Sequence, residues 1–180
     1  MNINLITPGK NAPDEINVVI EISQMSGPVK YEFDKTTGAI HVDRILLPAM
    51  QYPANYGFVP QTLGEDGDPV DVLVWSAPLV PGSVVEARPI GVLNMADEKG
   101  VDQKILALPL EKVDPLHAHI QCINDMPDAV LAQMKHFFER YKDLEEGKWV
   151  KVESWEDADI AKEIIQQGIE ACVTDSDKVS

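Results

Sequence analysis

The chain of 180 residues contains 44% hydrophobic and 25% charged residues, a composition typical of a globular domain with a substantial core. Its 15 basic and 30 acidic residues give a net charge of −15, which disfavours nucleic acid and anionic membranes as partners. An anionic substrate would also be repelled, unless metal ions or clustered basic side chains reverse the sign of the potential locally.

The sequence also carries signals about cellular location. Cys122 and Cys172 are far apart and lack the spacing of metal ligands, so we expect two thiols in a reducing compartment. The first residues show neither the basic region nor the apolar stretch of a signal peptide. No apolar run approaches the roughly 18 residues that a membrane span needs. We therefore expect a cytoplasmic protein with no membrane partner, whose residues 1–180 form a single domain.

Short strands are predicted through the first part of the chain. In residues 18–22 and 29–34 apolar and polar side chains alternate, which places Glu21, Lys30 and Glu32 on faces opposite the apolar ones. A hairpin turn at 36–38 and strands near residues 40–46, 70–75, 84–93 and 104–108 complete the strand predictions.

Helices are predicted only late in the chain. An apolar stripe at spacings of three and four is formed by Val130, Leu131, Met134, Phe137, Phe138 and Tyr141. Ser154 and Asp157 resemble a capping box that would open a second helix, and the residues from Thr174 onward are expected to form a frayed polar tail. Strands followed by helices predict an α+β, mainly β fold. We expect an OB-like, closed five-stranded β-barrel with additional strands and two C-terminal helices packed outside.

An acidic cluster stands at the beginning of one predicted strand. Asp66, Asp68 and Asp71 lie within six positions, and carboxylates this close repel unless a cation or a proton compensates. An EF-hand loop is excluded because position 70 is valine and position 77 is alanine. A phosphatase with a nucleophilic aspartate usually presents its Asp-x-Asp pair after a buried strand, whereas here the strand follows. A Mg²⁺ site and a plain acidic surface turn both remain open at this point.

Several blocks of sequence point to one family. They comprise VVIEI at 18–22, VKYEFDKTTGAIHVDR at 29–44, YPANYGFVPQTLGEDGDPVDVLV at 52–74, PGSVVEARPIGVLNMADEKGVDQKILALP at 81–109 and HFFERYKDLEEGKWVKVESW at 136–155. In this order, and with DGDPVDV at 66–72, the chain resembles the soluble family I inorganic pyrophosphatases of bacterial type. The resemblance implies Mg²⁺-dependent hydrolysis of pyrophosphate, as the small-molecule substrate, to two orthophosphates by a metal-activated water. It also implies a homohexamer.

The resemblance assigns roles to residues of this chain. Asp66, Asp71 and Asp102 match ligands of catalytic Mg²⁺, and Asp68 matches the general base. Asp97, Glu21 and Glu32 match carboxylates that hold further metal. Phosphate ligands and further catalytic groups are matched by Lys30, Arg44, Tyr56, Lys104, Tyr141 and Lys142. Seven carboxylates against four bases leave the pocket too negative for pyrophosphate until about two to four Mg²⁺ ions are added.

Other residues have no assigned catalytic role. Tyr52 matches an active-site tyrosine, although a packing role is equally compatible, and the contributions of Glu98 and Lys148 stay open. The four histidines lack metal spacing, and we expect surface or interface positions for His41, His117, His119 and His136. His136 falls in a helix that bacterial relatives use for hexamer packing, while Arg140 stands where relatives often carry another histidine.

Two other classes of function remain as alternatives to pyrophosphate hydrolysis. A catalytically silent barrel could bind divalent ions or polyphosphate, although every matched polar position is present. A hydrolase of nucleotides or other phosphate esters would need an apolar or aromatic groove beside the acids, which the sequence does not locate.

Overall fold

The computed structural model describes residues 3–178. Its strands are β1 (Ile16–Ile22), β2 (Val29–Phe33), β3 (Ile40–Ile45), β4 (Asn55–Phe58), β5 (Asp71–Val74), β6 (Val84–Asp97), β7 (Gly100–Val101), β8 (Lys104–Pro109) and β9 (Val150–Asp157). Its helices are α1 (Asp128–Arg140), α2 (Ala158–Lys178) and the short 3₁₀ turns η1 (Ile3–Leu5), η2 (Pro115–His117) and η3 (Ile123–Asp125).

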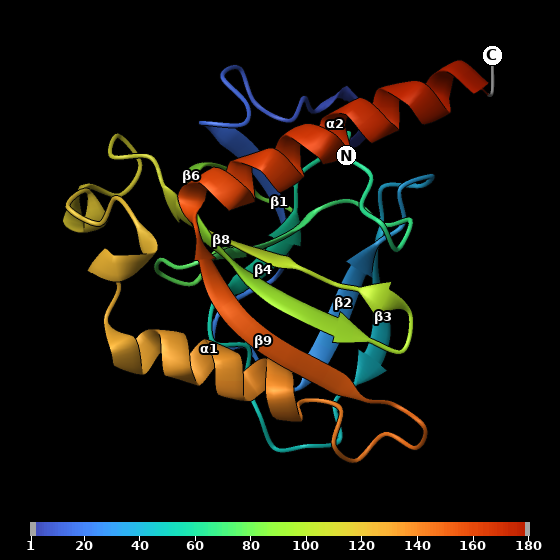
Figure 1. Ribbon diagram of the computed structural model, residues 1–180. Coiled ribbons are helices and arrows are strands. Elements are labelled where there is room, and N and C mark those ends of the chain that lie inside the picture. Colours follow the sequence, from blue (N-terminus) through green and yellow to red (C-terminus); the bar gives the residue numbers. More distant parts are fainter. Residues whose placement is uncertain (1–2, 179–180) are drawn as a thin grey trace.

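Five strands close into a ring. They follow the order β1-β4-β5-β8-β6, and β6 pairs with β1 to complete the circuit. The pairing of β5 with β8 is parallel, and the other pairings in the ring are antiparallel. This closed ring confirms the predicted five-stranded barrel, and its strands β1, β4, β6 and β8 can be followed in Figure 1.

Additional strands extend the ring. β9 pairs with the second half of β6, from Gly91 to Asp97, and β7 forms a tight hairpin with the end of β6. β2 and β3 form a separate two-stranded sheet, which stands to one side of the ring in Figure 1.

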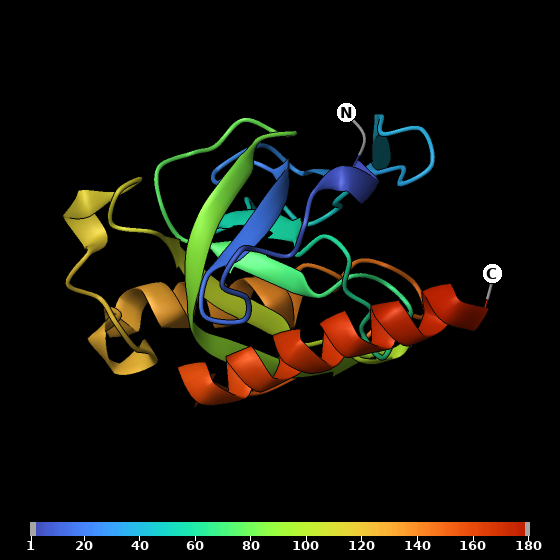
Figure 2. The ribbon, with the colours of Figure 1, turned by 90° about the horizontal axis from the view of Figure 1, so that it is seen from above.

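The two long helices lie outside the ring (Figures 1 and 2), and they pack on different apolar clusters. α1 contributes the buried side chains of Met134, Phe137 and Phe138 to a cluster that also contains residues of β4, β5, β6 and β8. α2 contributes Ala161 and Ile165 to a second cluster, which is rich in valine from the ring strands. The predicted placement of two C-terminal helices outside the barrel is therefore confirmed. None of the helices within residues 3–178 combines the length and apolar character needed to cross a bilayer.

Two predictions of local structure differ from the structure. Ser154 and Asp157 do not cap a helix, because residues 154–157 are the last part of β9, where Trp155 is in register with Leu93 of β6. The first helical residue is instead Ala158. Residues 174–178, expected as a polar tail, continue α2, and residues 179–180 lie outside the described part. β4 and β9 themselves were not predicted from the sequence pattern.

Candidate active site

A polar cleft of about 240 Å³ opens between the ring, the β2–β3 hairpin and the end of α1. The thirteen side chains to which the resemblance assigns a metal, base or phosphate role all line it, although they come from positions as far apart as 21 and 142. They are Glu21, Lys30, Glu32, Arg44, Tyr56, Asp66, Asp68, Asp71, Asp97, Asp102, Lys104, Tyr141 and Lys142. The individual roles of these residues stay predictions, but the fold brings the whole set together.

The centre of the cleft is a buried lysine between two carboxylates. Asp71 and Lys104 begin the parallel strands β5 and β8 and are direct partners in register. Lys104 Nζ donates to Asp71 Oδ2 at 2.5 Å and also to Asp102 Oδ1, and it lies 3.3 Å from the hydroxyl of Tyr56. Burial alone would lower the pKa of Lys104, but the two carboxylates raise it above the ordinary value, so the ammonium stays charged.

A second chain of alternating charges lines the cleft. Lys142 Nζ donates to Asp97 Oδ2 at 2.7 Å and lies 3.3 Å from Glu98 Oε2, while Lys148 Nζ lies 2.5 Å from Glu98 Oε1. Burial opposes ionisation of Glu98, but the hydrogen bond from Lys148 and the charge of Lys142 lower its pKa to about 2. Glu98 and Lys148, whose contributions the sequence left open, both line the cleft.

The β2–β3 hairpin presents two cations side by side. Lys30 and Arg44 are direct cross-strand partners. Lys30 pairs with Glu32 and, at 3.1 Å, with Asp43, whereas Arg44 Nε lies 3.2 Å from Glu145 Oε1. A planar guanidinium beside an ammonium suits oxygen-rich anions such as phosphate.

Glu21 is the carboxylate most affected by burial. It lies on β1 with only 8% of its surface exposed, and it accepts a hydrogen bond from the backbone N–H of Phe33 at 2.8 Å. Burial raises its pKa to about 7, so the group is poised between its neutral and charged forms near neutral pH. A cation placed beside it would favour the charged form.

Asp66 and Asp68 lie on the loop that enters β5. Gly67 between them has a φ of +86°, a conformation that favours glycine and turns the loop sharply. The backbone N–H of Asp68 donates to Asp66 Oδ1 at 3.1 Å. The Asp68 side chain is 57% exposed and meets Lys35 at 3.3 Å, whereas the Asp71 and Asp102 side chains are 18% and 13% exposed.

The donor set suits a hard divalent cation, because carboxylate oxygens are its preferred ligands. Among residues 3–178, no three Asp, Glu, His or Cys side chains already converge closely enough to hold an ion. Lys104 instead lies between Asp71 and Asp102, where an ion would neutralise the same two carboxylates. Burial and the charge of Asp71 raise the pKa of Asp102 even with Lys104 present, so the site can accept further positive charge.

Some residues of the cleft were missed, and one candidate lies outside it. Lys35 and Lys99 line the cleft, but they stand in turns, where no local pattern separates a ligand from a solvated lysine. Tyr52 is 2% exposed and packs between Phe137 and Tyr56, with ring centroids 4.8 and 5.7 Å away, so packing is the role its contacts support. His117 pairs with Asp114 at 2.7 Å and lies against the Trp75 ring.

Comparison with known proteins places the chain among close relatives. The family model described as inorganic pyrophosphatase matches residues 18–173. The chain is 56% identical over 177 residues to an inorganic pyrophosphatase of Xanthomonas axonopodis pv. citri, covering 98% of this chain and 99% of the relative. It is 57% identical over 166 residues to that of Aquifex pyrophilus, covering 92% and 93%. The solved inorganic pyrophosphatase of Helicobacter pylori superposes with a TM-score of 0.90 at 51% identity, covering 93% and 98%.

Proposed function

Since the chain belongs to the inorganic pyrophosphatase family, we propose that it hydrolyses pyrophosphate in the polar cleft, where one pyrophosphate and one water give two orthophosphates. The observation that carries the proposal is the alternation of acids and bases there, with Lys104 between Asp71 and Asp102. Phosphoryl transfer depends mainly on positioning and on stabilising charge, so a cleft of this kind suffices without a covalent nucleophile.

The basic side chains bind and orient the substrate. Lys30 and Arg44 would hold one phosphate from the hairpin, and Lys104 and Lys142 would approach from the ring and from the end of α1. The hydroxyls of Tyr56 and Tyr141 donate to phosphate oxygens, because burial raises the pKa of both phenols and keeps them protonated. Fixed donors of this kind stabilise the charge that develops on the leaving phosphate.

The carboxylates would hold divalent metal, and we propose several Mg²⁺ ions. Asp66, Asp71 and Asp102 are the proposed ligands at the centre, with Asp97, Glu21 and Glu32 holding further ions at the edges. Bound Mg²⁺ would neutralise phosphate charge and lower the pKa of the attacking water. The poised Glu21 carboxyl supports this assignment, because it can become fully charged when a cation approaches.

Asp68 is the proposed general base. Its exposed carboxylate can reach a water in the cleft, while its contact with Lys35, at 3.3 Å, is longer than the pairing of Asp71 with Lys104. In the attack, Asp68 takes the proton from the water as the oxygen bonds to phosphorus and the bridging P–O bond breaks. The leaving phosphate carries away the bridging oxygen, and the second orthophosphate contains the oxygen from water.

Three further expectations belong to the same proposal. We expect residues 1–180 to form a single domain. We also expect the protein to lie in the cytoplasm and to assemble as a homohexamer. Exposed apolar side chains on and beside the β2–β3 hairpin support assembly, because Val42, Ile45 and Leu47 are each at least 60% exposed. His136 and Arg140 on the exposed side of α1 are available for the helix contact that the family resemblance implies.

The test is phosphate release from pyrophosphate, with Mg²⁺ and with a chelator. We expect release from the wild type that depends on Mg²⁺ and falls by about a hundredfold or more in Asp68→Asn, since general bases contribute about 10²–10⁴-fold. Asp159→Asn, at an exposed aspartate in the first turn of α2, is the control and should behave as the wild type.

Each alternative outcome has a definite meaning. Undiminished release in Asp68→Asn would keep the reaction but reassign the base. A folded wild type that releases no phosphate, yet binds Mg²⁺, would contradict hydrolysis and support the silent binding barrel instead.

A further inference from the structure

The loop that carries Asp66 and Asp68 is tied together at its base by one buried hydroxyl. Thr62 is 4% exposed, and its Oγ1 donates to the carbonyl oxygen of Val59 at 2.7 Å. The same oxygen accepts a hydrogen bond from the backbone N–H of Val70 at 2.9 Å. Val59 N–H also donates to the Val70 carbonyl at 2.9 Å, so hydrogen bonds hold the two ends of the loop together. We call this contact, formed by Val59, Thr62 and Val70, the neck of the loop.

The neck rests against α2. The Leu63 N–H donates to the backbone carbonyl of Gly168 at 2.9 Å. A Cβ at Gly168 would lie 2.7 Å from Val70 Cγ2 and 3.3 Å from Thr62 Cβ, closer than side chains normally approach. The absence of a side chain at Gly168 therefore lets the helix lie directly against both chain segments of the neck, at Thr62 and at Val70.

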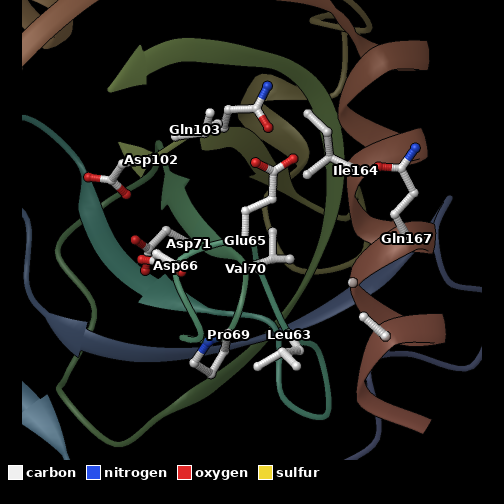
Figure 3. Close-up of a pocket in the computed structure, with 14 residues that line it drawn as sticks. Leu63, Glu65, Asp66, Pro69, Val70, Asp71, Asp102, Gln103, Ile164 and Gln167 are labelled. Atoms are coloured by element: carbon white, nitrogen blue, oxygen red, sulfur yellow. The ribbon is translucent and has the colours of Figure 1, made fainter. Parts of the chain in front are cut away.

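Beyond the neck, the loop is less closely supported. A pocket of about 220 Å³ separates it from α2 and β7, lined by Glu65, Gln103, Ile164 and Gln167 among others (Figure 3). Asp66, Asp71 and Asp102 also border this pocket, so the acids of the cleft have open space on the side facing α2. Because side-chain packing is incomplete there, the position of the loop depends strongly on its neck.

We propose that Thr62, supported by α2 at Gly168, is a positioning residue for the proposed metal ligands Asp66 and Asp71 and for the proposed base Asp68. Val70 is bound by the Thr62 hydroxyl and directly precedes Asp71, whose carboxylate meets Lys104. Loss of the hydroxyl would leave the buried Val70 N–H and the buried Val59 carbonyl without this hydrogen-bond partner, at the point where the loop joins the ring. The inference rests on the proposed function, because it assigns the support of those acids.

The first test compares Thr62→Val with Thr62→Ser. Valine keeps the shape of threonine and removes both hydrogen bonds, whereas serine keeps the hydroxyl. We expect Mg²⁺ affinity, measured by calorimetry without substrate, to fall by about tenfold or more in Thr62→Val, the range typical of groups that support metal ligands. kcat should fall as well, because Asp68 moves with the loop. Thr62→Ser should stay within about threefold of the wild type. Thr174→Val, at an exposed threonine of α2, is the matched control.

A second variant disturbs the neck from the side of α2 and keeps the Thr62 hydroxyl. Gly168→Ala should lower Mg²⁺ affinity, because Val70 or the helix must shift. Gly27→Ala is its control, since a Cβ at Gly27 would meet nothing within 4 Å. Circular dichroism establishes that each variant is folded. If Thr62→Val does not fold, the comparison of Gly168→Ala with Gly27→Ala decides.

The proposal is overturned if Thr62→Val binds Mg²⁺ as the wild type does, or if folded Thr62→Ser is as impaired as Thr62→Val. It is also overturned if Gly168→Ala leaves Mg²⁺ affinity unchanged. The calorimetric titration does not require turnover. A wild type that binds Mg²⁺ but releases no phosphate would therefore contradict the proposed function and leave the positioning role to be decided by the variants.

Discussion

Each buried lysine of the cleft has carboxylates as its nearest charged neighbours. Lys104 and Lys142 are 3% and 7% exposed, and burying an ammonium group is costly unless anions are paired with it. Asp71, Asp102 and Asp97 supply that compensation. If metal ions draw the carboxylates away, the lysines need new anions, and phosphate oxygens provide them. The same pairs that keep the cleft charged thus make it ready for a phosphate ligand together with metal.

Arg44 offers a test of how a phosphate ligand is aimed. Its Nε lies 3.2 Å from Glu145, which is 15% exposed and comes from the segment between α1 and β9. In Glu145→Gln we expect KM for pyrophosphate to rise about threefold with kcat nearly unchanged, because Arg44 loses one ion-pair partner, keeps the other, Asp43, and keeps its own charge. Steady-state kinetics at saturating Mg²⁺ measures both constants.

Glu146→Gln provides the control for Arg44, because the neighbouring Glu146 is exposed. A lower KM in Glu145→Gln would show that Glu145 competes with the substrate for the guanidinium, and an unchanged KM would show that Glu145 does not orient Arg44. Either result would contradict the positioning argument for Glu145.

At the scale of elements, alternation located some strands well and missed others. β1 and β2 were predicted almost to their ends because apolar and polar residues alternate in them. β4 is only four residues long and contains Gly57, so its pairing partners rather than its own pattern make it a strand. β9 was mistaken in part for a helix start, because Ser154 and Asp157 have cap spacing while the pairing with β6 is visible only in three dimensions.

The contact between β4 and β1 leaves no room for a side chain. A Cβ at Gly57 would lie 2.0 Å from the carbonyl oxygen of Val19, within the ring and next to Tyr56. We expect Gly57→Ala to lower the free energy of unfolding by about 2–3 kcal/mol or more, since the backbone of two paired strands must separate. For a chain of this size, that corresponds to a fall in Tm of roughly 5–10 °C.

Thermal denaturation followed by circular dichroism measures the change, with Gly27→Ala as the control in open space. Equal Tm values for the two variants would contradict the close approach of β4 to β1.

At the scale of the whole molecule, the site is assembled from segments distant in sequence. Asp71 pairs with Lys104 across β5 and β8, and Asp97 pairs with Lys142 from the end of α1. Periodicity could not predict these contacts, because each acid and base also reads as a solvated surface residue. The resemblance of several sequence blocks supplied the residue set, and the closed ring supplies the proximity. The excess of acidic charge then acts on the molecule as a whole, since a net charge of −15 opposes compactness.

Mg²⁺ should therefore stabilise the protein more than a monovalent salt does. Both salts screen the general repulsion, but only an ion bound by the folded cleft adds linkage, about 2.7 kcal/mol at a concentration one hundred times its Kd. We expect Tm to rise by roughly 5–10 °C more in MgCl₂ than in NaCl of equal ionic strength, at one protein concentration. Asp66→Asn should reduce this difference, whereas Asp159→Asn should preserve it, because Asp159 lies on α2 and away from the lining of the cleft. Equal rises in the two salts would mean that screening alone stabilises the chain, and the carboxylates of the cleft would then not constitute a metal site.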